Sequence, residues 1–196
     1  QPVVPVELNE DWLLINRMIM PVNVNPDSLG GEGGLGDTQY QAFFSPITDS
    51  EFTWGLGPVI GFPTATDATL GAQRWTAGPA LVGLVTTGPW VIGGTVNHQW
   101  DWGGSGDRGV NFTFIQPFIN YNFDKGWYLS SAPAITADWE NGDPNWTVPL
   151  GGGIGKVTKF GKQPVNIQAQ AFYNVVRPEN APDWSARLQV QFLFPK

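Results

Sequence analysis

The sequence predicts an all-β protein, a transmembrane antiparallel up-and-down β-barrel of about twelve strands. Three observations support this fold class. Strand-length segments alternate between apolar and polar residues, tryptophans bracket these segments, and the connections between them alternate between short and long. An outer-membrane barrel needs all three features, because its wall faces lipid outside and a polar interior, and its chain crosses the membrane as a meander.

The clearest alternating segment runs from Trp90 to Trp102. Successive side chains of a strand point to opposite faces, so Ile92 and Val96 share the tryptophan face while Asn97 and Gln99 lie on the other. At a tilt of about 45° and a rise of about 3.3 Å per residue, such a segment covers about 28 Å, roughly the thickness of the membrane hydrocarbon. Residues 127–139 repeat the pattern.

Eleven strand candidates follow one another along the chain, which we take as a single barrel domain over residues 1–196: 1–7, 11–22, 37–46, 52–63, 74–86, 89–102, 109–123, 126–139, 146–159, 164–176 and 184–195. Short links at 9–10, 48–50, 87–88, 124–126 and 161–162 alternate with longer ones at 23–36, 64–73, 103–108, 140–145 and 177–183. Short periplasmic turns and longer outer loops are typical of these barrels.

The number of candidates is odd, whereas bacterial single-chain barrels have an even number of strands and both termini in the periplasm. The sequence therefore predicts either twelve strands, with one before Gln1, or ten strands with residues 1–7 outside the barrel. We favour twelve. Gln1 is not an initiator residue, so the chain reads as a processed or truncated product.

Composition excludes several classes of function. The chain has no cysteine, so disulfides and thiolate metal sites are impossible, and no cofactor or metal site is expected. Its net charge of -7 argues against nucleic acid as a partner. No stretch approaches the roughly 20 consecutive apolar residues of a membrane helix, and the mean hydropathy of -0.15 is compatible with alternating strands.

The inward face is predicted to be a mostly neutral amide lining with few charges. The lumen and constriction candidates are Arg17, Arg74, Asp101, Asp138, Arg187, Gln99, Gln116, Asn120, Gln168 and Gln189. All of the charges except Arg17 are expected towards the outer mouth, either in ion pairs or as a selectivity ring. Arg17 is expected near mid-depth and is the best single candidate for a constriction residue, although Leu13, Ile15 and Ile19 share its face.

The outward face is predicted to meet lipid, with aromatic residues at the two membrane interfaces. The interface candidates are Trp54, Trp75, Trp90, Trp100, Trp102, Trp127, Trp139, Trp146 and Trp184. His98 lies on this face, where hydrogen bonding to lipid or tryptophan is its ordinary explanation. The longer loops carry acidic residues, which either keep the loops soluble or form a specific cation site, and we favour solubility: Asp27, Glu32, Asp67, Asp107, Glu140, Asp143, Glu179 and Asp183.

Several stretches resemble one family of Gram-negative outer-membrane barrels. They are residues 54–58 (WGLGP), 63–67 (PTATD), 116–122 (QPFINYN), 126–129 (GWYL), 135–140 (ITADWE), 146–153 (WTVPLGGG), 161–166 (GKQPVN) and 192–196 (FLFPK). The family is known as "transporter" or, misleadingly, "neuromedin U" proteins, and is related to the barrel proteins of phenol-degradation pathways. The resemblance covers nearly the whole chain, implies an outer-membrane barrel with a transport role, and supplies no catalytic motif.

The function expected from these observations is a channel or transporter, not an enzyme, that passes small polar or weakly apolar solutes through a narrow amide-lined lumen. A closed structural or surface-interaction barrel remains an alternative. Two further alternatives are a lipid hydrolase with His98 as its base and a soluble lectin-like sandwich. The expected partners are outer-membrane lipid and lipopolysaccharide, and the barrel-assembly machinery, which reads an aromatic-rich terminal strand. Gly57, Gly61 and Gly83 leave a homo-oligomer open.

Overall fold

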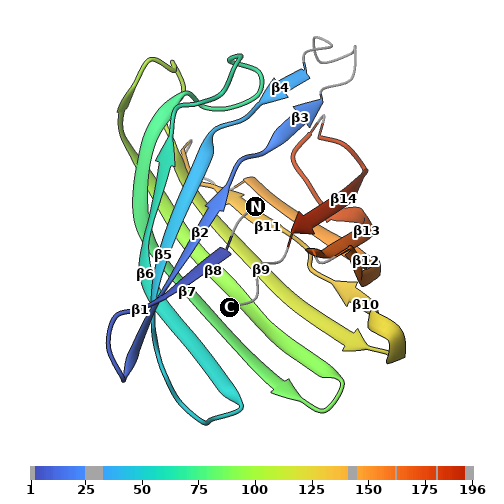
Figure 1. Cartoon of the computed structure of the whole chain (residues 1–196). Helices are drawn as coiled ribbons and strands as arrows, with labels where there is room; N and C mark the ends of the chain where they lie inside the picture. Colours follow the sequence, from blue (N-terminus) through green and yellow to red (C-terminus); the bar gives the residue numbers. More distant parts are fainter. Residues whose placement is uncertain (1–2, 25–32, 141–144, 162, 180, 193–196) are drawn as a thin grey trace.

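The computed structural model of the chain describes residues 3–24, 33–140, 145–161, 163–179 and 181–192 (Figure 1). It is built from one antiparallel sheet of 12 strands and a separate two-stranded sheet formed by β3 and β4. The strands are β1 (Val3–Glu7), β2 (Trp12–Ile19), β3 (Val22–Val24), β4 (Gly33–Leu35), β5 (Thr38–Pro46), β6 (Phe52–Phe62), β7 (Arg74–Thr87), β8 (Trp90–Gly104), β9 (Asn111–Asn122), β10 (Trp127–Ser131), β11 (Ile135–Asp138), β12 (Asn145–Phe160), β13 (Gln163–Val176) and β14 (Trp184–Phe192).

Each of the eleven predicted strand candidates contains a strand of the large sheet, and the order is that of a meander. One candidate is interrupted. β10 and β11 both pair with β9 on one side and β12 on the other, so together they occupy a single position in the sheet. The break between them contains Pro133, which lacks the backbone N–H that a central strand needs.

The connections sort by length as predicted, with short turns at one end of the sheet and long loops at the other (Figure 1). Two of the short turns use glycines with left-handed backbone, Gly88 at φ 54° and Gly161 at φ 61°. Such turns match the twist of the strands they join, and glycine adopts this conformation without steric cost. At the opposite end, the short sheet of β3 and β4 lies beyond β2 and β5 (Figure 1).

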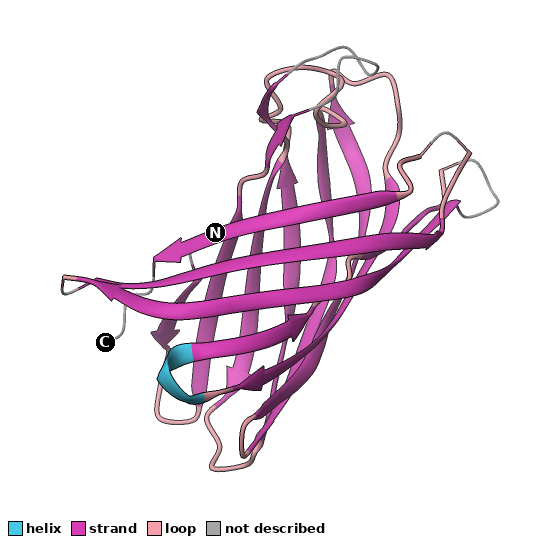
Figure 2. Cartoon of the chain, turned by 90° about the vertical axis from the view of Figure 1, so that its right-hand side faces the viewer, coloured by secondary structure: helices cyan, strands magenta, loops and turns pink. Residues whose placement is uncertain are grey.

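The sheet is strongly curled, so that its two ends face the same interior (Figures 1 and 2). One cavity is lined by side chains from β2 and β5, near one end of the sheet, and from β9 to β14 at the other. Among the described residues, β1 pairs only with β2, and β14 pairs only with β13. The two edge strands are therefore not hydrogen-bonded to each other.

The two faces of the sheet reverse the usual distribution of polarity. Gln41 and Gln99 on the inward face are 1% and 2% exposed, whereas Leu56 and Trp102 on the outward face are 53% and 69% exposed. Proteins that fold in water bury leucine and leave most glutamine side chains exposed. A two-layer sandwich would place its large apolar side chains between stacked sheets, and this chain has one large sheet instead.

Part of the interior is filled with apolar side chains rather than amides. Phe43, Val59 and Ala80 form a buried cluster on β5, β6 and β7, and Ile15 and Val82 pack against it. These inward positions are apolar, whereas the predicted inward amides Gln41 and Gln99 are buried at other positions of the same face. Ile15 and Arg17 are two positions apart on β2, so their side chains lie on the same face of the strand. No helix in the described parts of the chain is long and apolar enough to cross a membrane.

Candidate functional site: the interior cavity

The largest cavity has a volume of about 1020 Å³ and lies on the inward face of the curled sheet. It brings together six of the ten residues that the sequence predicts for the lumen: Arg17, Gln116, Asn120, Gln168, Arg187 and Gln189. They come from β2, β9, β13 and β14, which are far apart in the chain. The alternation of each strand directs these side chains inward, and the curl of the sheet makes them converge.

Gln99 belongs to the filled part of the interior. Its Nε2 donates to Asn97 Oδ1 at 2.9 Å, and its Oε1 accepts from the Thr76 hydroxyl at 2.8 Å. All three residues are buried. Gln99 therefore hydrogen-bonds to its neighbours within the wall and is not among the residues that line the cavity.

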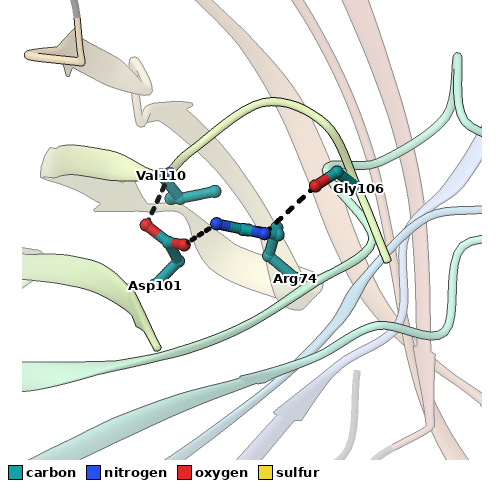
Figure 3. Close-up of polar contacts among 4 residues, drawn as sticks. All are labelled: Arg74, Asp101, Gly106 and Val110. Carbon is teal, nitrogen blue, oxygen red and sulfur yellow. Dashed lines mark hydrogen bonds and ion pairs between the residues drawn. The ribbon is translucent and has the colours of Figure 1, made fainter. Parts of the chain in front are cut away.

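Arg74 and Asp101 form an ion pair between β7 and β8 (Figure 3). Arg74 Nη1 also donates to the Gly106 carbonyl at 3.1 Å, and Asp101 Oδ1 accepts from the Val110 backbone N–H at 3.0 Å. These bonds tie the loop after β8 to the two strand ends at the long-loop end of the sheet. The prediction of ion pairing for these two residues is confirmed.

Asp138, at the end of β11, pairs with Arg108 of the loop between β8 and β9. Both residues line a second cavity of about 570 Å³, among the loops at the long-loop end. Asp138 thus lies at the long-loop end of the sheet, where it pairs with a loop arginine. In the described structure it does not reach the interior cavity.

Arg187 of β14 lines the same interior cavity as Arg17. Arg187 Nη1 donates to the Ala132 carbonyl at 3.4 Å, and its guanidinium carbon lies 5.6 Å from the centre of the Phe172 ring. In register it pairs with Gln170 of β13.

Arg17 lines the interior cavity, as expected of a lumen residue. It pairs in register with Gln41, and its Nη1 donates to Gln41 Oε1 at 3.3 Å. The cavity therefore contains two arginines, one contributed by each end of the sheet. Only the curl of the sheet places them together, since 170 positions separate them in the chain.

Sequence reasoning missed an aromatic part of the lining. Phe112, Phe114 and Phe118 of β9 face the cavity alongside Gln116 and Asn120. The signal was available, because these phenylalanines occupy the same alternating positions as the two predicted amides. The cavity wall is consequently mixed, with amides and guanidinium groups beside phenyl rings.

Tyr128 is a second lining residue that the sequence analysis did not single out. Its hydroxyl donates to Asn166 Oδ1 at 2.7 Å. Its ring lies against Gly155, where a Cβ atom would come within 2.1 Å of the Tyr128 Cζ. Glycine at this position thus makes room for the ring to lie along the wall, which keeps the interior open.

The predicted interface aromatics lie on the outward face. Seven of the nine are exposed: Trp54, Trp75, Trp90, Trp100, Trp102, Trp127 and Trp184. Ring contacts define two groups, one at each end of the sheet. Near the long loops, Trp75 contacts Phe62 and Trp102, and Trp139 contacts Trp146; near the short turns, Trp54 contacts Trp12, and Trp90 contacts Tyr121. Trp139 and Trp146 are half-buried.

His98 forms a local cluster on the outward face. Its Nδ1 lies 2.7 Å from Thr113 Oγ1, which also accepts from Trp139 Nε1 at 3.0 Å, and its ring stands edge-on to Trp100 at 4.3 Å. The hydrogen bond thus goes to a threonine rather than to a tryptophan. In the described structure the His98 side chain thus contacts Thr113 and Trp100.

The loops at the long-loop end contribute acidic side chains, of which Asp27, Glu32 and Asp143 lie outside the described residues. Asp67 caps a turn, accepting from the Thr69 backbone N–H and hydroxyl at 2.8 Å each. These hydrogen bonds lower the pKa of Asp67 below its ordinary value, since they stabilise the charged form. Among the described residues, no group of three or more histidine, aspartate or glutamate side chains could hold a metal ion.

No protein-family model matches the chain, and a search of curated proteins finds no significant match.

Proposed function

We propose that this protein is an outer-membrane β-barrel that passes small solutes through its interior without catalysing a reaction. The observation that carries the proposal is the reversed polarity of the sheet, with buried glutamines and exposed leucines. In a membrane, an outward leucine contacts lipid hydrocarbon, which carries no free-energy penalty. An inward amide can hydrogen-bond to side chains of neighbouring strands in the polar interior.

The two groups of outward tryptophans support a membrane position for the sheet. Indole rings favour the level of the lipid headgroups, because one side of the ring is apolar and the N–H seeks a polar partner. Trp90 belongs to the short-turn group and Trp102 to the long-loop group, at opposite ends of β8. The separation estimated for them, about 28 Å along a tilted strand, matches the hydrocarbon thickness.

A sheet in a membrane needs every backbone N–H and C=O to be paired, because lipid offers no hydrogen bonds. We propose that one further strand joins β1 to β14 and closes a barrel of twelve. In this proposal the short turns and the termini lie in the periplasm and the long loops outside. The partners are then outer-membrane lipid, lipopolysaccharide and the barrel-assembly machinery, as the family resemblance also implies.

The interior cavity is the proposed path for solutes. Its lining of amides and phenyl rings suits small polar or weakly apolar molecules, and the apolar cluster around Phe43 and Val59 narrows the passage. That cluster also favours a second candidate function, a closed barrel with a structural or surface role. Barrels of about eight strands are filled by side chains and those of about sixteen leave a channel, so a twelve-strand barrel lies between them.

Conductance in planar lipid bilayers distinguishes the two functions. The matched variants are Gln168→Trp, which places an indole in the cavity, and Ile167→Trp, which places one on the outward face of the same strand. For a solute path, the wild type conducts, Gln168→Trp reduces the conductance, and Ile167→Trp leaves it unchanged. Correctly inserted wild-type protein without conductance would exclude transport and favour the closed barrel.

A further inference from the structure

Two arginines lie in the described wall of the interior cavity. Arg17 on β2 and Arg187 on β14 interact electrostatically with each other. Arg187 contacts the carbonyl oxygen of Ala132 and the face of Phe172, both of which are neutral. Each guanidinium has five N–H donors in a fixed planar arrangement that suits carboxylate and phosphate oxygens.

Negative charge on the same wall is sparse. Among the described residues that line the cavity, Asp37 is the one carboxylate. Its two oxygens accept backbone N–H groups of Ala65 and Gln73, at 3.0 Å each, which hold it to the loop between β6 and β7. Among the described residues of the lining, two arginines therefore stand against one aspartate, although the whole chain carries -7.

The same cavity offers an apolar surface. Phe112, Phe114 and Phe118 line it from β9, and the Phe172 ring lies under the Arg187 guanidinium. A solute with a carboxylate at one end and a hydrocarbon body would satisfy both parts of this wall. An uncharged polar solute would hydrogen-bond to the amides alone, and a cation would be repelled by the two guanidinium groups.

We propose that Arg17 and Arg187 make the interior selective for anions and bind small monocarboxylates that carry a hydrocarbon body. This inference rests on the proposed solute path through the cavity. The acidic loops act against it, since they attract cations to the mouth. Their charges are exposed and hydrated, however, and screening limits them to about 10 Å at 0.1 M salt and about 3 Å at 1 M. Charges inside the passage act on the permeating ion directly.

The first test is the reversal potential in a KCl gradient across a planar bilayer. The wild type is expected to prefer chloride, and the preference is expected to persist at high salt. The double variant Arg17→Gln/Arg187→Gln should lose it, whereas Arg17→Lys/Arg187→Lys should keep its sign. The matched control is Arg177→Gln, which removes an arginine paired with Asp183 at 2.5 Å in an outer loop. A cation preference in the wild type, or an unchanged double variant, would overturn the inference.

The second test measures binding without requiring conductance. Calorimetric titration of the detergent-solubilised protein with sodium hexanoate should show binding that the double glutamine variant weakens about tenfold or more, since each charged hydrogen bond contributes about 1.5–3 kcal/mol. Sodium acetate, which lacks the hydrocarbon body, should bind more weakly. If the protein binds hexanoate but does not conduct, the solute path is refuted, while carboxylate binding by Arg17 and Arg187 is supported. Absent binding in the wild type, or equal binding in the wild type and the double glutamine variant, would refute the site.

Discussion

Leu81 offers the sharpest test of whether the outward face meets lipid. It lies at the middle of β7, pairs with Leu56 on one side and Val96 on the other, and is 45% exposed. The expected effect of Leu81→Arg on stability differs between a surface that faces water and one that faces lipid. In water the new side chain would reach solvent, and a surface substitution of this kind changes stability by no more than about 0.5 kcal/mol.

In a membrane, an arginine at the level of the bilayer midplane on the lipid face of a barrel costs about 2–4 kcal/mol. At about 1.36 kcal/mol per factor of ten, this cost lowers the folding equilibrium constant about 30- to 900-fold. We expect Leu81→Arg to show this loss in denaturant titrations of the protein in phospholipid vesicles, followed by tryptophan fluorescence.

The chain provides a matched control in Leu8, which is 48% exposed and lies in the short turn after β1. Leu8→Arg should cost about 0–1 kcal/mol, because the cost of a charge falls towards the membrane interface. If both arginine variants lost less than about 0.5 kcal/mol, the outward face would be a water-exposed surface, and the membrane proposal would fail.

Two further predictions concern the cavity wall and an outer loop. Tyr128→Phe should lower the free energy of unfolding by about 0.5–1.5 kcal/mol, because the hydrogen bond from the tyrosine hydroxyl to Asn166 is lost. Gly155→Ala should push the Tyr128 ring into the cavity and reduce the conductance. Restored conductance in Gly155→Ala/Tyr128→Ala would support this mechanism, and an unaffected Gly155→Ala would contradict it. At pH values above the ordinary aspartate pKa, the hydrogen bonds from Thr69 to the Asp67 carboxylate should persist. They should be lost as the pH falls through the lowered pKa of this carboxyl, because protonation removes the charged acceptor. The Thr69 amide shift in NMR should report a midpoint below 3.8, and a midpoint at or above 3.8 would exclude this role for the turn.

Much of the wall could be predicted from the chain because β-strand alternation is local. Trp90, Ile92, Asn97 and Gln99 take opposite faces for purely geometric reasons, and every second residue follows. The lengths of the connections are equally local, so the order of strands and the two ends of the sheet were correct. The positions of the outward tryptophans followed from the same periodicity.

What the chain could not reveal is which inward residues meet across the interior. Those positions depend on strand tilt and on register between neighbours, so the chain could not reveal that Arg17 and Arg187 line the same cavity. The partner of Asp138 was likewise undetermined, because Arg108 approaches it from a loop.

The sequence alone determined the type of each strand, its two faces and the meander, because these depend on a period of two residues and on turn chemistry. Only the tertiary structure decided that one part of the interior is packed with Phe43 and Val59 while another part remains a cavity with two arginines. The physical reason is that packing and charge interaction depend on distances across the curled sheet, which combine the tilt and register of every strand between the two groups.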